Sequence, residues 1–140
     1  MTTTPATGDD ELRLMFQRVA RRIRNNRSAD VSDSQLSVLF HLDLAGSCSP
    51  SELAEHDRVT PPSMNRTLNG LEHAGLIRRD PSPVDARKVL VSLTASGNEL
   101  IAETRRLRTA WFSQRLAELT AEERAALEVV VPILKRLADS

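Results

Sequence analysis

Cysteine and aromatic residues are scarce in this chain of 140 residues, and neither sign of charge is in excess. The single cysteine, Cys48, excludes an internal disulfide framework and fits a reducing compartment. With three Phe, one Trp and no Tyr, the core has to be built from Leu, Val, Ile and Ala, which favours packed helices over a β-sandwich. The 19 basic and 19 acidic residues balance, so only the distribution of charge can point to a partner.

Long apolar segments are also missing. Residues 129–134 form the longest apolar run near the C-terminus, and this run is far too short to span a bilayer. Residues 1–10 are polar and carry no apolar run of the kind found in signal peptides. We therefore expect a cytoplasmic protein without a membrane partner.

Residues that commonly carry catalysis or hold metals do not cluster in the sequence. His41, His56 and His73 fall in three different expected helices, without metal-ligand spacing. The sequence contains no Ser-His-Asp, Cys-His or paired-carboxylate constellation with supporting context, and no glycine-rich phosphate loop. We expect neither an enzyme nor a bound cofactor or metal. Cys48 is interpreted as a small buried residue, with a redox-sensing thiol as the alternative.

The first helix is expected from about residue 11 to residue 27, because apolar residues recur there at helical spacing. Those residues are Leu12, Met15, Phe16, Val19, Ala20 and Ile23. Residues 13–27 also contain six arginines and no acid, and the arginines fall largely on the other side of the helix. That side is either a solvated face, which is the usual case, or a surface that contacts phosphates or another anion.

Three further helices carry clear start and stop signals. Ser32 and Gln35 have the spacing of a capping box, and Gly46 can end the helix that they begin. Residues 49–52 (Ser-Pro-Ser-Glu) begin a short helix, and Thr60 with Pro61 begins the next one, which ends at Gly75. Two short capped helices separated by a brief turn indicate a helix-turn-helix.

After residue 75 the spacing of apolar residues no longer follows the helical repeat. Residues 76–79 and 88–93 have the pattern of strands, and the turn-forming residues 80–87 lie between them, so a hairpin with an exposed tip, a wing, is expected. Thr94 can cap a long helix over about residues 95–117. Thr120 and Glu123 form another capping box before a last helix, which Pro132 should bend or interrupt.

The helix over residues 61–75 has two distinct faces. At about 100° per residue, Met64, Leu68, Leu71 and Gly75 fall in one stripe, which we expect to pack inward. The opposite face has no acid at its centre and consists of Pro62, Arg66, Asn69 and His73, flanked by Ser63 and Asn65. Arg and Asn side chains can read base edges or hold phosphates, and the helix N-terminus at Thr60 is suited to a phosphate.

Residues 49–97 resemble the multiple antibiotic resistance regulator (MarR) family. The resemblance rests on four stretches: Ser-Glu-Leu-Ala at 51–54, Val-Thr-Pro-Pro-Ser-Met-Asn-Arg at 59–66, Glu-His-Ala-Gly-Leu-Ile at 72–77, and Asp-Ala-Arg-Lys-Val-Leu-Val-Ser-Leu-Thr at 85–94, closed by Gly97. The Asp-x-Arg motif before a strand that ends in Leu-Thr is the most specific part. The flanking helices also fit the family in number and length, so the resemblance covers nearly the whole chain.

The resemblance implies a mainly α fold with a small β-wing. It implies a winged helix-turn-helix of about six helices and a two- to three-stranded antiparallel hairpin, in a homodimer held by the N- and C-terminal helices. The expected organisation is a flexible tail at 1–10, an N-terminal helix of the dimer region at 11–30, a DNA-binding domain at 31–94 and C-terminal dimerisation helices at 95–140.

The resemblance also implies roles for single residues. Arg87 would enter the minor groove, Asp85 would hold the wing in shape, and Arg66 matches a basic position of the recognition helix. The full predicted DNA-binding set is Thr60, Ser63, Asn65, Arg66, Asn69, Arg79, Asp85, Arg87 and Lys88. Gly70 departs from the family pattern, which usually has a larger and often basic residue at this position.

The function implied is that of a homodimeric transcriptional regulator, a ligand-responsive repressor, on a pseudo-palindromic operator in double-stranded DNA. A winged-helix protein-interaction module that does not bind DNA is the alternative. Family members often bind small aromatic or anionic compounds. Arg108, Arg115 and Trp111 are the candidate effector residues, although ion pairing at a helix junction is the interpretation we favour for the two arginines.

Overall fold

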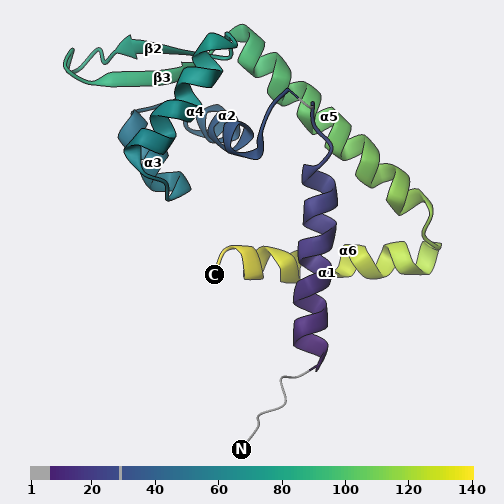
Figure 1. Ribbon diagram of the computed structural model, residues 1–140. Coiled ribbons are helices and arrows are strands. Elements are labelled where there is room, and N and C mark those ends of the chain that lie inside the picture. Colours follow the sequence, from purple (N-terminus) through teal and green to yellow (C-terminus); the bar gives the residue numbers. More distant parts are fainter. Residues whose placement is uncertain (1–6, 29) are drawn as a thin grey trace, which may run out of the picture. The chain divides into compact units, whose positions relative to one another are not determined.

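The computed structural model describes residues 7–28 and 30–140, and within them it contains six helices and three short strands. Figure 1 shows the elements, which in chain order are α1 (Thr7–Arg24), α2 (Asp33–Ala45), β1 (Ser47–Cys48), α3 (Pro50–Asp57), α4 (Pro61–His73), β2 (Ile77–Pro81), β3 (Val89–Leu93), α5 (Ala95–Ala117) and α6 (Ala121–Ala138). The predicted fold class, mainly helical with a small wing, is confirmed. None of the described helices is both long enough and apolar enough to cross a membrane.

The chain divides into two compact units. One unit comprises Arg27–Arg106, and the other comprises Leu107–Ser140 together with the described part of Met1–Asn26. Helix α5 runs through the boundary, so its first half belongs with the helix-turn-helix and its second half with α1 and α6.

The unit Arg27–Arg106 is built around a continuous apolar core. Helices α2, α3 and α4 each bury one apolar stripe, and β2, β3 and α5 close the core. The largest side chains with almost no exposure are Val38, Leu39, Leu42, Leu53, Met64, Leu68, Leu71, Ile77, Val91, Ile101 and Thr104. The inward stripe predicted for α4 is therefore confirmed for Met64, Leu68 and Leu71. Gly75, the fourth residue of the predicted stripe, is exposed, because α4 ends before it.

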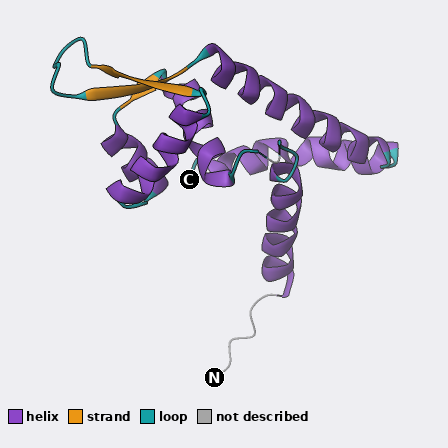
Figure 2. Cartoon of the chain, turned by 45° about the horizontal axis from the view of Figure 1, so that its top comes forward, coloured by secondary structure: helices purple, strands orange, loops and turns teal. Residues whose placement is uncertain are grey.

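The strands form one antiparallel sheet in the order β1-β3-β2, and the β2–β3 hairpin extends beyond the helices of its unit (Figure 2). Ile77 pairs with Leu93 and Pro81 with Val89, so the segment between Pro81 and Val89 forms the tip. Strand β1 was not recognised in the sequence as a separate element. It pairs Cys48 with Val91 and thereby fixes the turn between α2 and α3 to the sheet.

The predicted capping signals are present as hydrogen bonds. The hydroxyls of Ser32, Ser49 and Thr120 each accept a bond from the backbone amide three residues on, and the amide of each cap residue donates to the side-chain oxygen at that position. Gly75, at φ 75°, ends α4 as predicted, and the Leu76 amide donates to the Leu71 carbonyl oxygen (3.0 Å).

Two expectations need correction. Helix α1 begins at Thr7, so residues 7–10 are helical rather than part of a tail, because Asp9 and Asp10 favour a helix N-terminus; residues 1–6 of the expected tail lie outside the described residues. Helix α6 is not interrupted at Pro132 but continues through it. A proline removes only one backbone hydrogen bond, and the remaining turns carry the helix past it.

Candidate nucleic-acid interface

Helix α4 presents its polar residues outward because its apolar residues are held in the core. Asn65, Arg66 and Asn69 are exposed, and Ser63 is half-buried. No acidic side chain interrupts this face between Pro61 and Leu71. The outward face therefore offers hydrogen-bond donors and acceptors together with one full positive charge, a combination suited to base edges and phosphates.

The N-terminus of α4 differs from the phosphate site that we expected at Thr60. The first two helical residues, Pro61 and Pro62, have no N–H group, and the Ser63 amide donates to the Thr60 Oγ1 (3.3 Å). The Met64 amide donates to the Thr60 carbonyl oxygen (2.9 Å). The first turn thus has no spare backbone donor for an anion, and Thr60 acts as the helix cap.

A hydrogen bond joins the recognition helix to the wing. Arg79 Nη2 on β2 donates to Asn69 Oδ1 on α4, at 3.1 Å. Arg79 is half-buried, and its Nε is buried without a hydrogen-bond partner in the described part of the chain. The side-chain oxygen of Asn69 is therefore committed to Arg79. Sequence reasoning placed both residues at the interface but could not anticipate that they pair.

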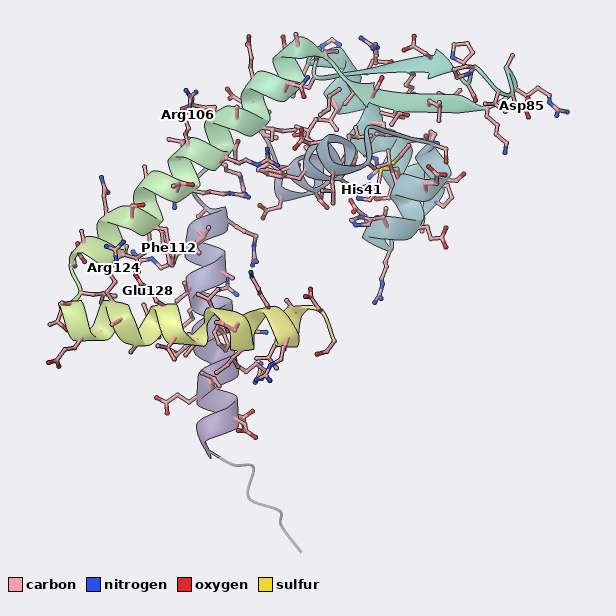
Figure 3. The ribbon with its side chains drawn as sticks, turned by 180° about the vertical axis from the view of Figure 1, so that it is seen from behind. His41, Asp85, Arg106, Phe112, Arg124 and Glu128 are labelled. Carbon is pink, nitrogen blue, oxygen red and sulfur yellow. The ribbon has the colours of Figure 1, made fainter. Side chains whose placement is uncertain are left out.

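The wing tip is shaped by Asp85 and Arg87. Arg87 Nε donates to Asp85 Oδ1 (3.1 Å) and Arg87 Nη2 donates to Asp85 Oδ2 (3.3 Å), while the Arg87 amide also donates to Oδ1 (3.1 Å). The Arg87 side chain is 91% exposed in this position. Figure 3 shows Asp85 at the outer end of the hairpin. The side-chain hydrogen bond from Arg87, helped by the bond from its backbone, lowers the pKa of the Asp85 carboxyl.

Other charges on the hairpin have defined partners or face solvent. Arg78 Nε lies 3.2 Å from Asp80 Oδ2. Lys88 is exposed, and its backbone amide donates to the Asp85 carbonyl oxygen (2.9 Å). The hairpin therefore carries two cationic side chains, on Arg87 and Lys88, at its outer end, and two arginines with partners, Arg78 and Arg79, on β2.

The candidate effector residues all lie in the unit that contains α1 and α6. Two guanidinium groups lie over the Trp111 ring, that of Arg22 at 5.2 Å and that of Arg115 at 5.3 Å from its centroid. Arg115 also pairs with Glu118 (3.1 Å). Arg108 Nη2 instead donates to the Arg24 carbonyl oxygen (3.3 Å). The structure brings Trp111 and Arg115 together, and it adds Arg22, which sequence reasoning missed because α1 is distant in the chain.

The other potentially reactive side chains, His41, His56 and Cys48, make contacts within the fold. The rings of His41 and His56 stack at 3.8 Å, and His56 Nδ1 lies 2.8 Å from Asp57 Oδ1. Across residues 7–28 and 30–140, no group of His, Cys, Asp and Glu side chains has a geometry that could hold a metal ion. Cys48 is buried, as predicted, and burial together with the charge of Glu52 raises the pKa of its thiol.

A capped two-helix unit followed by a two-stranded wing defines the winged helix-turn-helix class of DNA-binding proteins. The comparisons place the chain more closely. The MarR family model matches residues 31–89. An uncharacterised HTH-type transcriptional regulator of Mycobacterium bovis is 42% identical over 130 residues, which cover 92% of this chain and 91% of that protein. The chain belongs to the MarR family and is a DNA-binding transcriptional regulator rather than an enzyme.

Two further relatives bear on function. An HTH-type transcriptional repressor of Mycobacterium bovis is 33% identical, and the match covers 82% of this chain and 86% of the relative. A mutant MarR from E. coli, solved in complex with operator DNA, is 28% identical with a TM-score of 0.62, over 90% of this chain and 91% of that one. That structure shows that a protein of this fold binds operator DNA.

Proposed function

We propose that the chain is a homodimeric repressor that binds a pseudo-palindromic operator and is released by a small effector. The observation that carries this proposal is the exposed Arg87, held by Asp85 at the end of a hairpin that belongs to the same compact unit as the acid-free face of α4. One compact unit thus offers side chains of the right chemistry to two neighbouring grooves of one duplex.

Within this proposal the two elements have different tasks. Arg66, Asn65 and Asn69 contact base edges or phosphates in the major groove, where each base pair has a distinct pattern of donors and acceptors. Arg87 enters the adjacent minor groove, whose negative potential is strongest where A·T pairs narrow it. Lys88 neutralises a backbone phosphate, and Arg79 holds Asn69 in position.

The apolar surface of the unit that contains α1 and α6 supports the proposal of a homodimer. Helices α1, α5 and α6 expose large apolar side chains, among them Leu12, Phe16, Val129 and Leu137. A groove of about 510 Å³ runs among these helices and is lined mainly by apolar residues, including Phe16, Trp111, Phe112 and Leu127. Apolar surface of this extent marks an interaction site, and a two-fold dimer would cover it on both copies.

We assign residues 11–30 and 95–140 to the dimer region and residues 31–94 to DNA binding, as the sequence led us to expect. A two-fold dimer presents two recognition helices, and an operator with half-sites one helical turn apart requires them to lie about 34–36 Å from one another. An effector that favours a different spacing would weaken binding.

Fluorescence anisotropy with fragments of the protein's own promoter region tests DNA binding. We expect tight binding whose logarithm falls linearly with the logarithm of salt concentration, with a slope of about −0.9 per neutralised phosphate. Arg66→Ala and Arg87→Ala should each weaken binding at least about tenfold. Arg106→Ala is the matched control, because Arg106 pairs with Glu103 on α5 (Figure 3).

The same experiment addresses the alternative of a protein-interaction module. Binding that does not depend on salt, or that survives the loss of both Arg66 and Arg87, would contradict the proposal. Either result would favour the alternative, a winged-helix protein-interaction module that does not bind DNA.

For the effector, the contact of the Trp111 ring with the guanidinium groups of both Arg22 and Arg115 supports a small aromatic anion as the ligand. A thermal-shift screen with phenolic acids tests this. The unfolding midpoint of the natural protein should rise with ligand concentration, and Arg115→Ala should abolish the rise. Arg108→Ala tests the second candidate. If no compound changes any midpoint, the arginines serve only the structural pairing.

A further inference from the structure

The tip of the wing carries an apolar side chain as well as Arg87. Val84 is 96% exposed, and it directly precedes Asp85, the residue that holds Arg87. Its position is fixed by the loop. The Val84 amide donates to Ser82 Oγ (3.2 Å), and the Ser82 amide donates to the Lys88 carbonyl oxygen (2.8 Å) and closes the tip. Val84 and Arg87 therefore belong to one hydrogen-bonded loop and approach any groove together.

We propose that Val84 determines specificity by disfavouring G·C pairs in the minor groove that receives the wing. This inference rests on the proposed function, in which Arg87 enters that groove. In the minor groove an A·T pair shows only acceptors, whereas a G·C pair adds the donor amino group of guanine. Arg87 supplies donors for the acceptors, but it supplies nothing that the amino group can donate to.

Val84 adds to this discrimination because its two methyl groups exclude water and cannot accept a hydrogen bond. An amino group covered by these methyl groups would lose its water partner without gaining another, and such an unsatisfied donor is costly. Apolar side chains that lie against minor-groove base steps occur in several DNA-binding proteins. Val84 thus adds a preference for A·T pairs to the preference that arises from the attraction of Arg87 to a narrow groove.

Val84→Thr provides a sharp test, because threonine keeps the branched shape and replaces one methyl group with a hydroxyl that can accept a bond. The probes are three duplexes derived from one promoter fragment that binds. All three duplexes share the bases that the two α4 helices would contact. They differ only in the flanking base pairs that the wing would contact, which are A·T, G·C or inosine·C. Inosine lacks the amino group of guanine but otherwise pairs in the same way.

We expect the full-length natural protein to bind the A·T and inosine·C duplexes within about twofold of one another and the G·C duplex about tenfold more weakly. In Val84→Thr the difference in affinity between the inosine·C and G·C duplexes should shrink to about threefold or less, and the affinity for the A·T duplex should be unchanged. Circular dichroism melting should not distinguish the variants, since the side chain is exposed.

If the natural protein, Val84→Thr and Val84→Ala all show the same difference in affinity between the inosine·C and G·C duplexes, the assignment to Val84 is overturned, while DNA binding itself stands. Failure of the natural protein to bind any of the duplexes, or full binding by Arg87→Ala, would overturn the proposed function instead. The two failures are therefore distinguishable.

Discussion

Gly97, in the first turn of α5, lies so close to the carbonyl oxygen of Leu76 that a β-carbon on residue 97 would overlap that oxygen. The same carbonyl accepts a hydrogen bond from the Thr94 amide (3.1 Å), and the Thr94 hydroxyl donates to the Gly75 carbonyl oxygen (2.6 Å). The start of α5 is thus fixed directly to the start of the wing. Helix α5 then continues along the chain into the other compact unit.

Gly97→Ala should destabilise the protein by about 1–3 kcal/mol, because the backbone of Leu76 cannot move aside without disturbing β2. Chemical denaturation at fixed protein concentration measures this change. Gly8→Ala in α1 is the control, since a β-carbon there meets nothing within 4 Å. It should leave stability unchanged or raise it by up to about 1 kcal/mol. Equal stabilities of the two variants would contradict the close approach.

The pairing of Asp85 with Arg87 predicts a specific titration. The carboxyl pKa is depressed in the folded state, so the pairing is fully formed above the ordinary pKa of aspartate and is lost as the pH falls through the depressed value. Carboxyl NMR titration should show Asp85 ionising below its ordinary range in the natural protein. In Arg87→Gln the pKa should return toward that range. An unchanged pKa in the variant would show that Arg87 is not the cause.

The bond between Asn69 and Arg79 predicts a stability effect on the DNA-binding face. Asn69→Ala leaves the half-buried guanidinium without its acceptor, and we expect a loss of about 1 kcal/mol. Asn65→Ala, at an exposed position of the same helix, should stay within about 0.5 kcal/mol of the natural protein. Urea denaturation of both variants checks the difference, and a similar effect of the two substitutions would argue against the pairing.

The apolar face of the α1, α5 and α6 unit predicts that a charge introduced there prevents dimerisation. Phe112 lines the grooves between these helices, so Phe112→Glu should shift the protein to monomer in analytical ultracentrifugation and weaken operator binding at least about tenfold. Ser113→Glu introduces the same charge at the next residue of α5, which is exposed and does not line the grooves. If Phe112→Glu sediments like Ser113→Glu, the second copy does not cover this face.

Much of the fold could be predicted because the decisive interactions are local. Ser32, Ser49 and Thr120 cap their helices through bonds to residues three positions away, so the capping pattern is visible in the sequence. Gly75 ends α4 through its own backbone conformation. The beginning of α1 was placed too late, because apolar spacing marks the apolar face of a helix and the polar first turn of α1 carries none of it.

The sequence by itself determined the capped helices of the helix-turn-helix, the hairpin that follows them and the inward-facing Met64, Leu68 and Leu71 of α4, because each depends on the spacing of residues within one segment. The wing role of Arg87 is what the family resemblance implies. Only the tertiary structure decided that Asn69 supports Arg79, that the Arg22 guanidinium lies over the Trp111 ring, and that Gly97 leaves room for Leu76. Each of these contacts joins segments separated by ten or more residues. Such pairings depend on how the core brings helices and strands together, which no local pattern records.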